Sequence, residues 1–191
     1  LIDPKRVTFT KFRHVPFVEQ IETETGAILQ LLRDIVATME TRYTNLSNAG
    51  LNQYNGEHIF VIIDEIADLM VVCKKEITPL IQRIAQLGRA GNIHLIVATQ
   101  CPNRKIIPAE LTVNFGGRVA LRCLNAIESR QLINRKGAET LPQYWRCIYL
   151  HCDGLYYAGN IPYMPGEIQN IMDFWLKQGN NDDYFISHSL K

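Results

Sequence analysis

The pattern of apolar and polar positions divides the chain into helical and extended segments. Apolar residues recur at steps of three and four across residues 25–46, which predicts a long amphipathic helix. The continuous apolar, mostly β-branched run at 59–63 has the character of a strand buried on both faces, and 93–98 is a second such run. Between them, apolar positions at 80–87 predict a helix that begins at Thr78-Pro79, as N-cap and first helical residue. Strand, helix and strand of these lengths make a βαβ unit with parallel strands.

The rest of the chain carries shorter segments of both kinds. We expect a strand ending in a turn at 1–5, a strand at 119–124, a short helix at 126–133, a hairpin of 146–151 with 155–161, and a last helix at 167–175. The fold class predicted from these elements is α/β, with a mostly parallel sheet flanked by helices. We place one domain at 1–178 and a polar C-terminal tail at 179–191.

Candidate chemistry lies where the two apolar strands end. Asp64 and Glu65 follow the first strand, and Gln100 follows the second. Because the carboxyl ends of parallel strands meet at one sheet edge, where open α/β sheets bind ligands, we expect these three side chains to gather there. Asp68, one helical turn beyond Asp64, either faces the same mouth or is a surface acid or cap. Taken alone, the first strand could also be an ordinary core strand that ends at two solvated acids.

Composition narrows the class of protein without identifying it. The chain has 191 residues, of which 47% are hydrophobic and 20% charged, with a net charge of +1, so any nucleic-acid contact must come from a local patch. No apolar stretch is long enough to span a bilayer. The five cysteines are scattered without paired CxxC spacing, which favours reduced thiols and a cytoplasmic location over disulfides or a zinc site. The 191 residues contain no GxxxxGK[ST] phosphate-binding loop.

Several segments together resemble one family. The runs IDPK, VIIDEIADLM, IQRIAQLGRAGNIHLIVATQ, NFGGRVALRC, ESRQLI and KGAETL are similar, in order and spacing, to the motor domain of the FtsK/SpoIIIE DNA translocases. The likeness covers about residues 1–141. It implies a RecA-like P-loop NTPase core that uses ATP and Mg²⁺. It also implies self-association into a ring, expected to be a hexamer, around double-stranded DNA.

The resemblance assigns roles to individual positions. Asp64 matches the Walker B aspartate that holds Mg²⁺ through water, Glu65 the catalytic glutamate, and Gln100 the polar sensor of the γ-phosphate or attacking water. Arg118 and Arg89 match arginines near subunit boundaries, and each is a candidate finger acting on a neighbouring subunit or a structural salt-bridge residue. We favour Arg118, because it follows the flexible Gly116-Gly117 turn.

Asp3 and Lys5 match the IDPK motif and are candidate nucleotide contacts, or simply a turn with a solvated lysine. Candidate DNA contacts are four basic residues expected in loops, namely Lys74, Lys75, Arg104 and Lys105. Ordinary solvation is the alternative for each of them.

The sequence also departs from the family. The family's phosphate-binding loop would lie upstream of Leu1, so we expect a core that is incomplete on its N-terminal side, with 1–178 as the C-terminal part of the ATPase domain. Such a fragment would bind ATP weakly or not at all and be inactive alone, and a membrane anchor could lie outside it. Cys101 and Asn103 replace the usual Arg and Ser, and Asn134 replaces Asp, which suggests a mobile-element or conjugation relative.

Three functions therefore stay open. The first is a DNA-pumping ATPase motor. The second is a non-hydrolytic module for coupling or assembly in DNA transfer. The third is an unrelated magnesium hydrolase that uses Asp64, Glu65 and Asp68.

Overall fold

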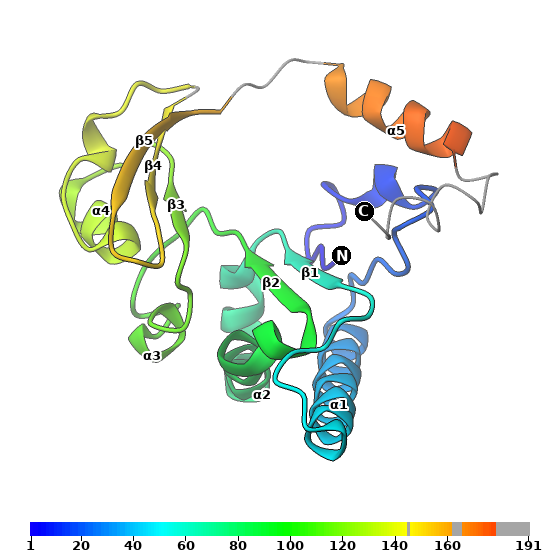
Figure 1. Cartoon of the computed structure of the whole chain (residues 1–191). Helices are drawn as coiled ribbons and strands as arrows, with labels where there is room; N and C mark the ends of the chain where they lie inside the picture. The colour runs from blue at the N-terminus through cyan, green and yellow to red at the C-terminus, as the bar shows by residue number, and fades with distance from the viewer. Residues whose placement is uncertain (145, 162–165, 179–191) are drawn as a thin grey trace.

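The computed structural model describes residues 1–144, 146–161 and 166–178. The predicted tail at 179–191 lies outside the described residues. Figure 1 shows a helix-covered parallel sheet in the first part of the chain, a separate antiparallel sheet in the second, and helix α5 (Glu167–Gln178) beside the N-terminal segment. Met172 of α5 is buried, and the ring of Trp175 packs edge-on against Phe17 at 5.3 Å between centroids.

Two parallel strands form the first sheet, as predicted. Strands β1 (Ile59–Ile63) and β2 (Ile93–Val97) pair in parallel, with Ile59 opposite Ile93. Ile2 makes isolated parallel bridges to Ile63 and to Glu22, which adds the N-terminal segment at the edge of β1. The connection between the strands is helical, so this part is the expected βαβ unit.

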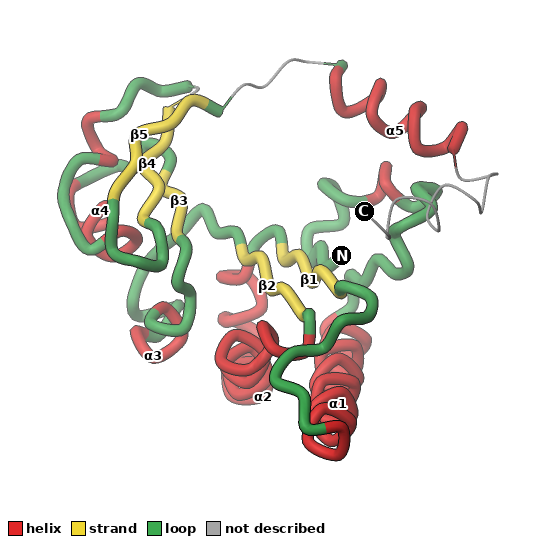
Figure 2. Tube along the Cα trace, viewed as in Figure 1, coloured by secondary structure: helices red, strands yellow, loops and turns green. Residues whose placement is uncertain are grey.

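Two long helices cover one face of this sheet (Figures 1 and 2). Helix α1 (Thr25–Ala49) ends at Gly50, whose φ of 65° is the left-handed conformation that glycine adopts readily. Helix α2 (Ile66–Leu87) continues into the short η2 (Gly88–Gly91). Their apolar sides and the inner face of β1 form the main core, whose fully buried residues include Ile28, Leu32, Met39, Ile63 and Ile77.

The predicted helix start at Thr78-Pro79 is wrong. Pro79 lies inside α2, and the helical backbone is interrupted six residues earlier, at Cys73 (φ −137°, ψ 37°). Cys73 is buried, and its thiol donates to the Leu69 carbonyl at 3.3 Å. Burial of Ile77 and Ile81 in the core keeps the chain helical across the proline, so tertiary packing overrides the local N-cap signal.

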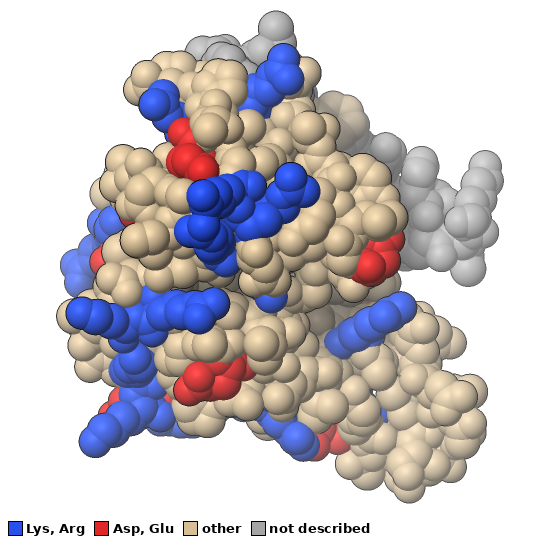
Figure 3. All heavy atoms as spheres, turned by 90° about the vertical axis from the view of Figure 1, so that its left-hand side faces the viewer, with Lys and Arg blue, Asp and Glu red and all other residues tan. Residues whose placement is uncertain are grey.

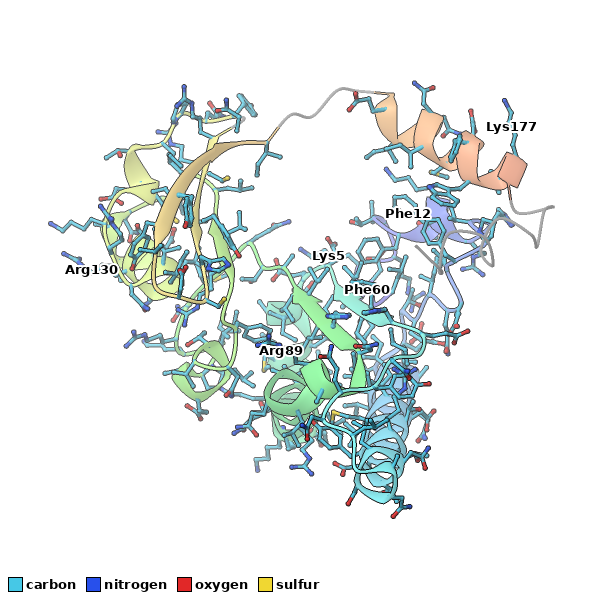
Figure 4. All side chains as sticks on the ribbon, in the orientation of Figure 1. Lys5, Phe12, Phe60, Arg89, Arg130 and Lys177 are labelled. Carbon is cyan, nitrogen blue, oxygen red and sulfur yellow. The ribbon has the colours of Figure 1, made fainter. Side chains whose placement is uncertain are left out.

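The other face of the β1–β2 sheet is open in the described residues. Phe60 is 58% exposed and Ile96 is 49% exposed, and Figure 4 shows Phe60 on the side away from α1 and α2. The rings of Phe60 and His94 stack at 4.7 Å, and His58 Nδ1 lies 2.8 Å from His94 Nε2. Burial, followed by the neighbouring His58, lowers the pKa of His94.

The second sheet corrects the prediction of a mostly parallel fold. Strands β3 (Arg118–Ala120), β4 (Arg146–Leu150) and β5 (Tyr156–Asn160) are antiparallel in the order β3-β4-β5. The short turn between β4 and β5 permits only antiparallel pairing, in agreement with the predicted hairpin. Helix α4 (Ala126–Ile133) and η3 (Ala138–Thr140) close one face around Ala120, Ile133 and Leu150.

Three shorter features lie between or before these elements. They are η1 (Thr10–Phe12), α3 (Ala109–Thr112), and the 101–108 loop that leads from β2 into α3. None of the helices in the described ranges is long and apolar enough to cross a membrane.

Candidate functional site

The candidate site lies at the carboxyl ends of β1 and β2. Asp64 and Glu65 directly follow β1, while Thr99 and Gln100 follow β2. The backbone N–H of Gln100 donates to Glu65 Oε2 at 2.8 Å, which confirms that the two strand ends share one edge. The Gln100 side chain is exposed, so it is free to meet a ligand at this edge.

Glu65 is a buried carboxylate with its own set of hydrogen-bond donors. It is the N-cap of α2, and only 3% of the residue is exposed. Its Oε1 accepts from the Ala67 N–H at 3.2 Å and from the Thr99 hydroxyl at 2.6 Å, while Oε2 accepts from Gln100. These donors offset the cost of burying a charge, so the reading of Glu65 as a solvated acid is wrong.

Asp64 is more open than Glu65 and fits a metal ion held through water. The residue is half-buried, and Thr8 donates its hydroxyl to Oδ2 at 2.9 Å. In the described part of the chain, no three His, Cys, Asp or Glu side chains gather into a metal-binding group. A single carboxylate suits Mg²⁺, which retains several of its waters and is often bound by one or two carboxylates together with phosphate oxygens.

Lys5 lies near Glu65 and Asp68, whereas Asp3 is part of the turn that carries Lys5. Lys5 Nζ lies 4.0 Å from Glu65 Oε2 and 3.7 Å from Asp68 Oδ2. Asp3 is fully buried, and its Oδ2 accepts from the Phe9 N–H at 2.9 Å, while Oδ1 has no partner among the described residues. Lys5 and Asp68 therefore belong to the mouth of the site, and Asp3 lies beneath it.

A groove with a volume of about 400 Å³ opens beside Asp68. It is lined by Pro4, Thr23, Thr25, Asp68, Leu69, Val71 and Val72.

The two candidate finger arginines lie in different surroundings. Arg118, on β3, donates from Nε to the Phe115 carbonyl at 3.2 Å and from a terminal nitrogen to the Leu132 carbonyl at 3.1 Å. Partial burial lowers the pKa of its guanidinium. Arg89 is exposed in η2, just before β2, which places it at the sheet edge opposite Asp64. The described chain therefore brings neither arginine to its own acidic pair.

The four candidate DNA contacts lie in one neighbourhood. Lys74 and Lys75 lie within α2, just after its interruption, so the prediction of a loop is wrong for them. Arg104 and Lys105 lie in the 101–108 loop, as expected. Lys74 Nζ donates to the Lys105 carbonyl at 2.9 Å, which ties the loop to α2. Lys75, Arg104 and Lys105 are exposed, whereas Lys74 is half-buried. Lys74 therefore holds the loop in place in addition to contributing positive charge.

Two hydroxyl groups at the site were missed by reasoning from the sequence. Thr8 holds Asp64 across 56 positions, and Thr99 holds Glu65 across 34. Thr99 carried a usable signal, because it precedes Gln100 at the strand end and so had to lie near Glu65. Thr8 carried none, because its approach depends on the path of residues 5–9.

Comparison with known proteins places the site within a matched segment. Residues 48–104 match the model of the FtsK/SpoIIIE family, which includes Asp64, Glu65 and Gln100. The chain is 35% identical over 161 residues to the DNA translocase FtsK of Sporosarcina ureae, covering 74% of this chain and 21% of that protein. It is 36% identical over 156 residues to the DNA translocase SftA of Bacillus subtilis, covering 74% of this chain and 16% of that protein. The chain thus spans about a fifth of the length of such relatives.

Solved structures share the fold over nearly the whole chain. The pCW3 conjugation coupling protein TcpA, in its monomer form with ATPγS, superimposes with a TM-score of 0.79 at 23% identity, covering 92% of this chain and 55% of that one. The cytoplasmic domain of the type VII secretion ATPase EccC of Thermomonospora curvata gives a TM-score of 0.72 at 19% identity, covering 91% of this chain and 22% of that one. Together with the family match, this likeness supports an α/β fold of the RecA-like class.

Proposed function

Because this chain belongs to the FtsK/SpoIIIE family, we propose that it supplies the metal-binding and water-activating half of an ATP-driven motor that moves double-stranded DNA. One observation carries the proposal. The carboxylates of Asp64 and Glu65 and the polar residue Gln100 lie together at the carboxyl edge of a parallel sheet, inside the matched segment. This is the edge at which α/β proteins bind and process nucleotides.

Each residue at this edge has a distinct part in the proposal. Asp64 would hold Mg²⁺ through water, and the ion would neutralise charge on the phosphates of ATP. Glu65 accepts a proton from, or orients, the attacking water, while the Gln100 amide contacts the same water or the terminal phosphate. Lys5 lies close enough to Glu65 and to Asp68 to offset their charge. No GxxxxGK[ST] loop occurs in these 191 residues, so we expect this chain alone to bind ATP weakly.

The basic neighbourhood around the 101–108 loop is the proposed DNA contact. Lys75, Arg104 and Lys105 are exposed there, and Lys74 ties the loop to α2. Figure 3 shows further Lys and Arg side chains on the side of the molecule that carries α4, where Arg130 points outward in Figure 4. Such patches supply sequence-independent attraction to phosphates even though the net charge is only +1.

We further propose that copies of the chain assemble into a ring, with an arginine of one copy acting on the next. Arg89 is the better candidate because it is exposed and can reach a neighbouring copy. Arg118 instead donates to the Phe115 and Leu132 carbonyls of its own chain. An arginine acting between subunits is worth about 10³-fold or more in turnover. Exchange of Arg89 for Ala would then abolish turnover only when every copy carries the exchange.

ATP turnover by the full-length protein that carries this sequence tests the proposal. We expect double-stranded DNA to stimulate turnover and Glu65→Gln to lower it by about a hundredfold or more. Glu76→Gln is the matched control, because Glu76 is an exposed glutamate on α2, outside the site. The motor would be refuted if double-stranded DNA did not stimulate ATP turnover, or if Glu65→Gln left ATP turnover unchanged.

A non-hydrolytic coupling module is the second candidate. It is suggested by the likeness to a protein described as a conjugation coupling protein. A sequence upstream of Leu1 without a GK[ST] motif would favour it. The protein would then bind DNA, as measured by fluorescence anisotropy, without turning over ATP.

A further inference from the structure

The hydrogen bonds of Glu65 hold its carboxylate in a withdrawn state, in which it is turned away from any water that it could activate. A carboxylate has about four acceptor positions, and three of them are taken by Ala67, Thr99 and Gln100. The remaining side of Oε2 faces the Lys5 ammonium, 4.0 Å away. A general base must lie about 2.6–3.2 Å from the water that it activates. With 3% of the residue exposed, Glu65 has little room for such a water in this arrangement.

Thr99 is the donor that fixes this position. Its Oγ1 lies 2.6 Å from Glu65 Oε1 and 3.0 Å from the backbone nitrogen of Cys101. Oγ1 accepts the Cys101 N–H through a lone pair and donates its own hydrogen to Glu65 Oε1. A hydroxyl donating to a carboxylate at this distance makes a strong, charge-assisted bond.

The same residues continue into the basic loop. Residues 99–101 lead directly into the 101–108 loop, which carries Arg104 and Lys105. The loop is in turn held to α2 by the Lys74–Lys105 contact. An unbroken series of covalent and hydrogen bonds thus joins the proposed DNA contact to the carboxylate of Glu65.

We propose that Thr99 is a positioning residue that latches Glu65 in the withdrawn state, and that phosphate contact at the 101–108 loop releases it. DNA that engages Arg104 and Lys105 pulls on residues 99–101, which lengthens the bonds from Thr99 and Gln100 to Glu65. The freed carboxylate then turns toward the mouth beside Lys5. The latch rests on the proposed motor function and names its regulation: the site is restrained until DNA is present.

Carboxyl labelling of the chain tests the latch without any ATP turnover. A water-soluble carbodiimide with a small amine modifies accessible carboxylates, and mass spectrometry measures the modification at each residue. We expect Thr99→Val to raise the labelling of Glu65 several-fold, because valine keeps the shape but removes the donor. Thr99→Ser retains the hydroxyl and should keep Glu65 as protected as in the wild type.

Two acids in the chain serve as internal references. Asp3 is fully buried and accepts from Phe9, away from Thr99, while Asp34 is exposed on α1, outside the site. Labelling of both should be the same in all three proteins. Unchanged labelling of Glu65 in Thr99→Val would overturn the latch. An equal rise at Asp3 would also overturn it, because Thr99 would then support the fold in general.

Addition of a short DNA duplex tests the release. We expect the duplex to raise Glu65 labelling in the wild type by a factor similar to that of Thr99→Val, with no further rise in that variant. A duplex that binds, by fluorescence anisotropy, without changing Glu65 labelling would overturn the release step. A duplex that does not bind would instead refute the proposed DNA function, and Thr99→Val would still decide whether the latch exists.

Discussion

Arg42 joins three segments that position the two site strands, and its replacement gives a sharp test of the fold. The residue lies on α1 and is only 8% exposed. A terminal guanidinium nitrogen donates to the Glu57 carbonyl, just before β1, at 3.0 Å, and to the Gly91 carbonyl, just before β2, at 2.6 Å. The guanidinium carbon also lies 4.2 Å from the centre of the Tyr54 ring.

Arg42→Met keeps most of the packing of the side-chain stem and removes the donors. Each hydrogen bond from a charged donor is worth about 1.5 kcal/mol or more, and a largely buried cation–π contact about 1 kcal/mol. Relief from burying a charge offsets part of this loss. We therefore expect the free energy of unfolding to fall by about 3 kcal/mol, a large share of the roughly 5–15 kcal/mol of a typical domain.

Urea unfolding followed by circular dichroism measures this loss. With an m-value of about 2 kcal/mol/M, the midpoint should move down by about 1.5 M at unchanged slope. Arg33→Met, at an exposed position of the same helix, is the control and should change stability by no more than about 0.5 kcal/mol. A loss below about 1 kcal/mol for Arg42→Met would refute the view that Arg42 holds α1 to both strand starts.

Two further predictions concern charge. If the four basic residues contact phosphates, the log–log slope of DNA affinity against salt should be about −3.6, and Lys75→Met should reduce its magnitude by about 0.9. Lys74→Met should weaken binding more than Lys75→Met, because it also frees the loop at Lys105; equal effects in a salt-dependent anisotropy series would contradict this. The pKa of His94 is lowered in the folded chain, so protonation favours the unfolded state and the free energy of unfolding should fall as the pH drops below about 6.5. His94→Phe should flatten this dependence in urea unfolding at about pH 7.5 and about pH 5.5, and an unchanged dependence would assign it to other groups.

Regular periodicity made much of the fold predictable from the sequence. The apolar steps of α1, the two apolar strands and the hairpin of β4 and β5 all appear where the pattern indicated. The rule that parallel strands end at one edge also predicts Gln100 next to Glu65, as the structure has it. Local signals were misleading at Thr78-Pro79, where burial of the flanking isoleucines in the core carried α2 through the proline.

The sequence by itself therefore determined which acids and which polar residue share the site, because strand direction and element order follow from local patterns. Only the tertiary structure decided how those acids are held. Thr8, Thr99 and Lys5 reach them from 34 to 60 positions away, and such contacts depend on the three-dimensional path of loops that carry no periodic signal. Tertiary structure also determined that Glu65 is buried and hydrogen-bonded rather than solvated, since two of its three donors, Thr99 and Gln100, come from the segment that follows β2.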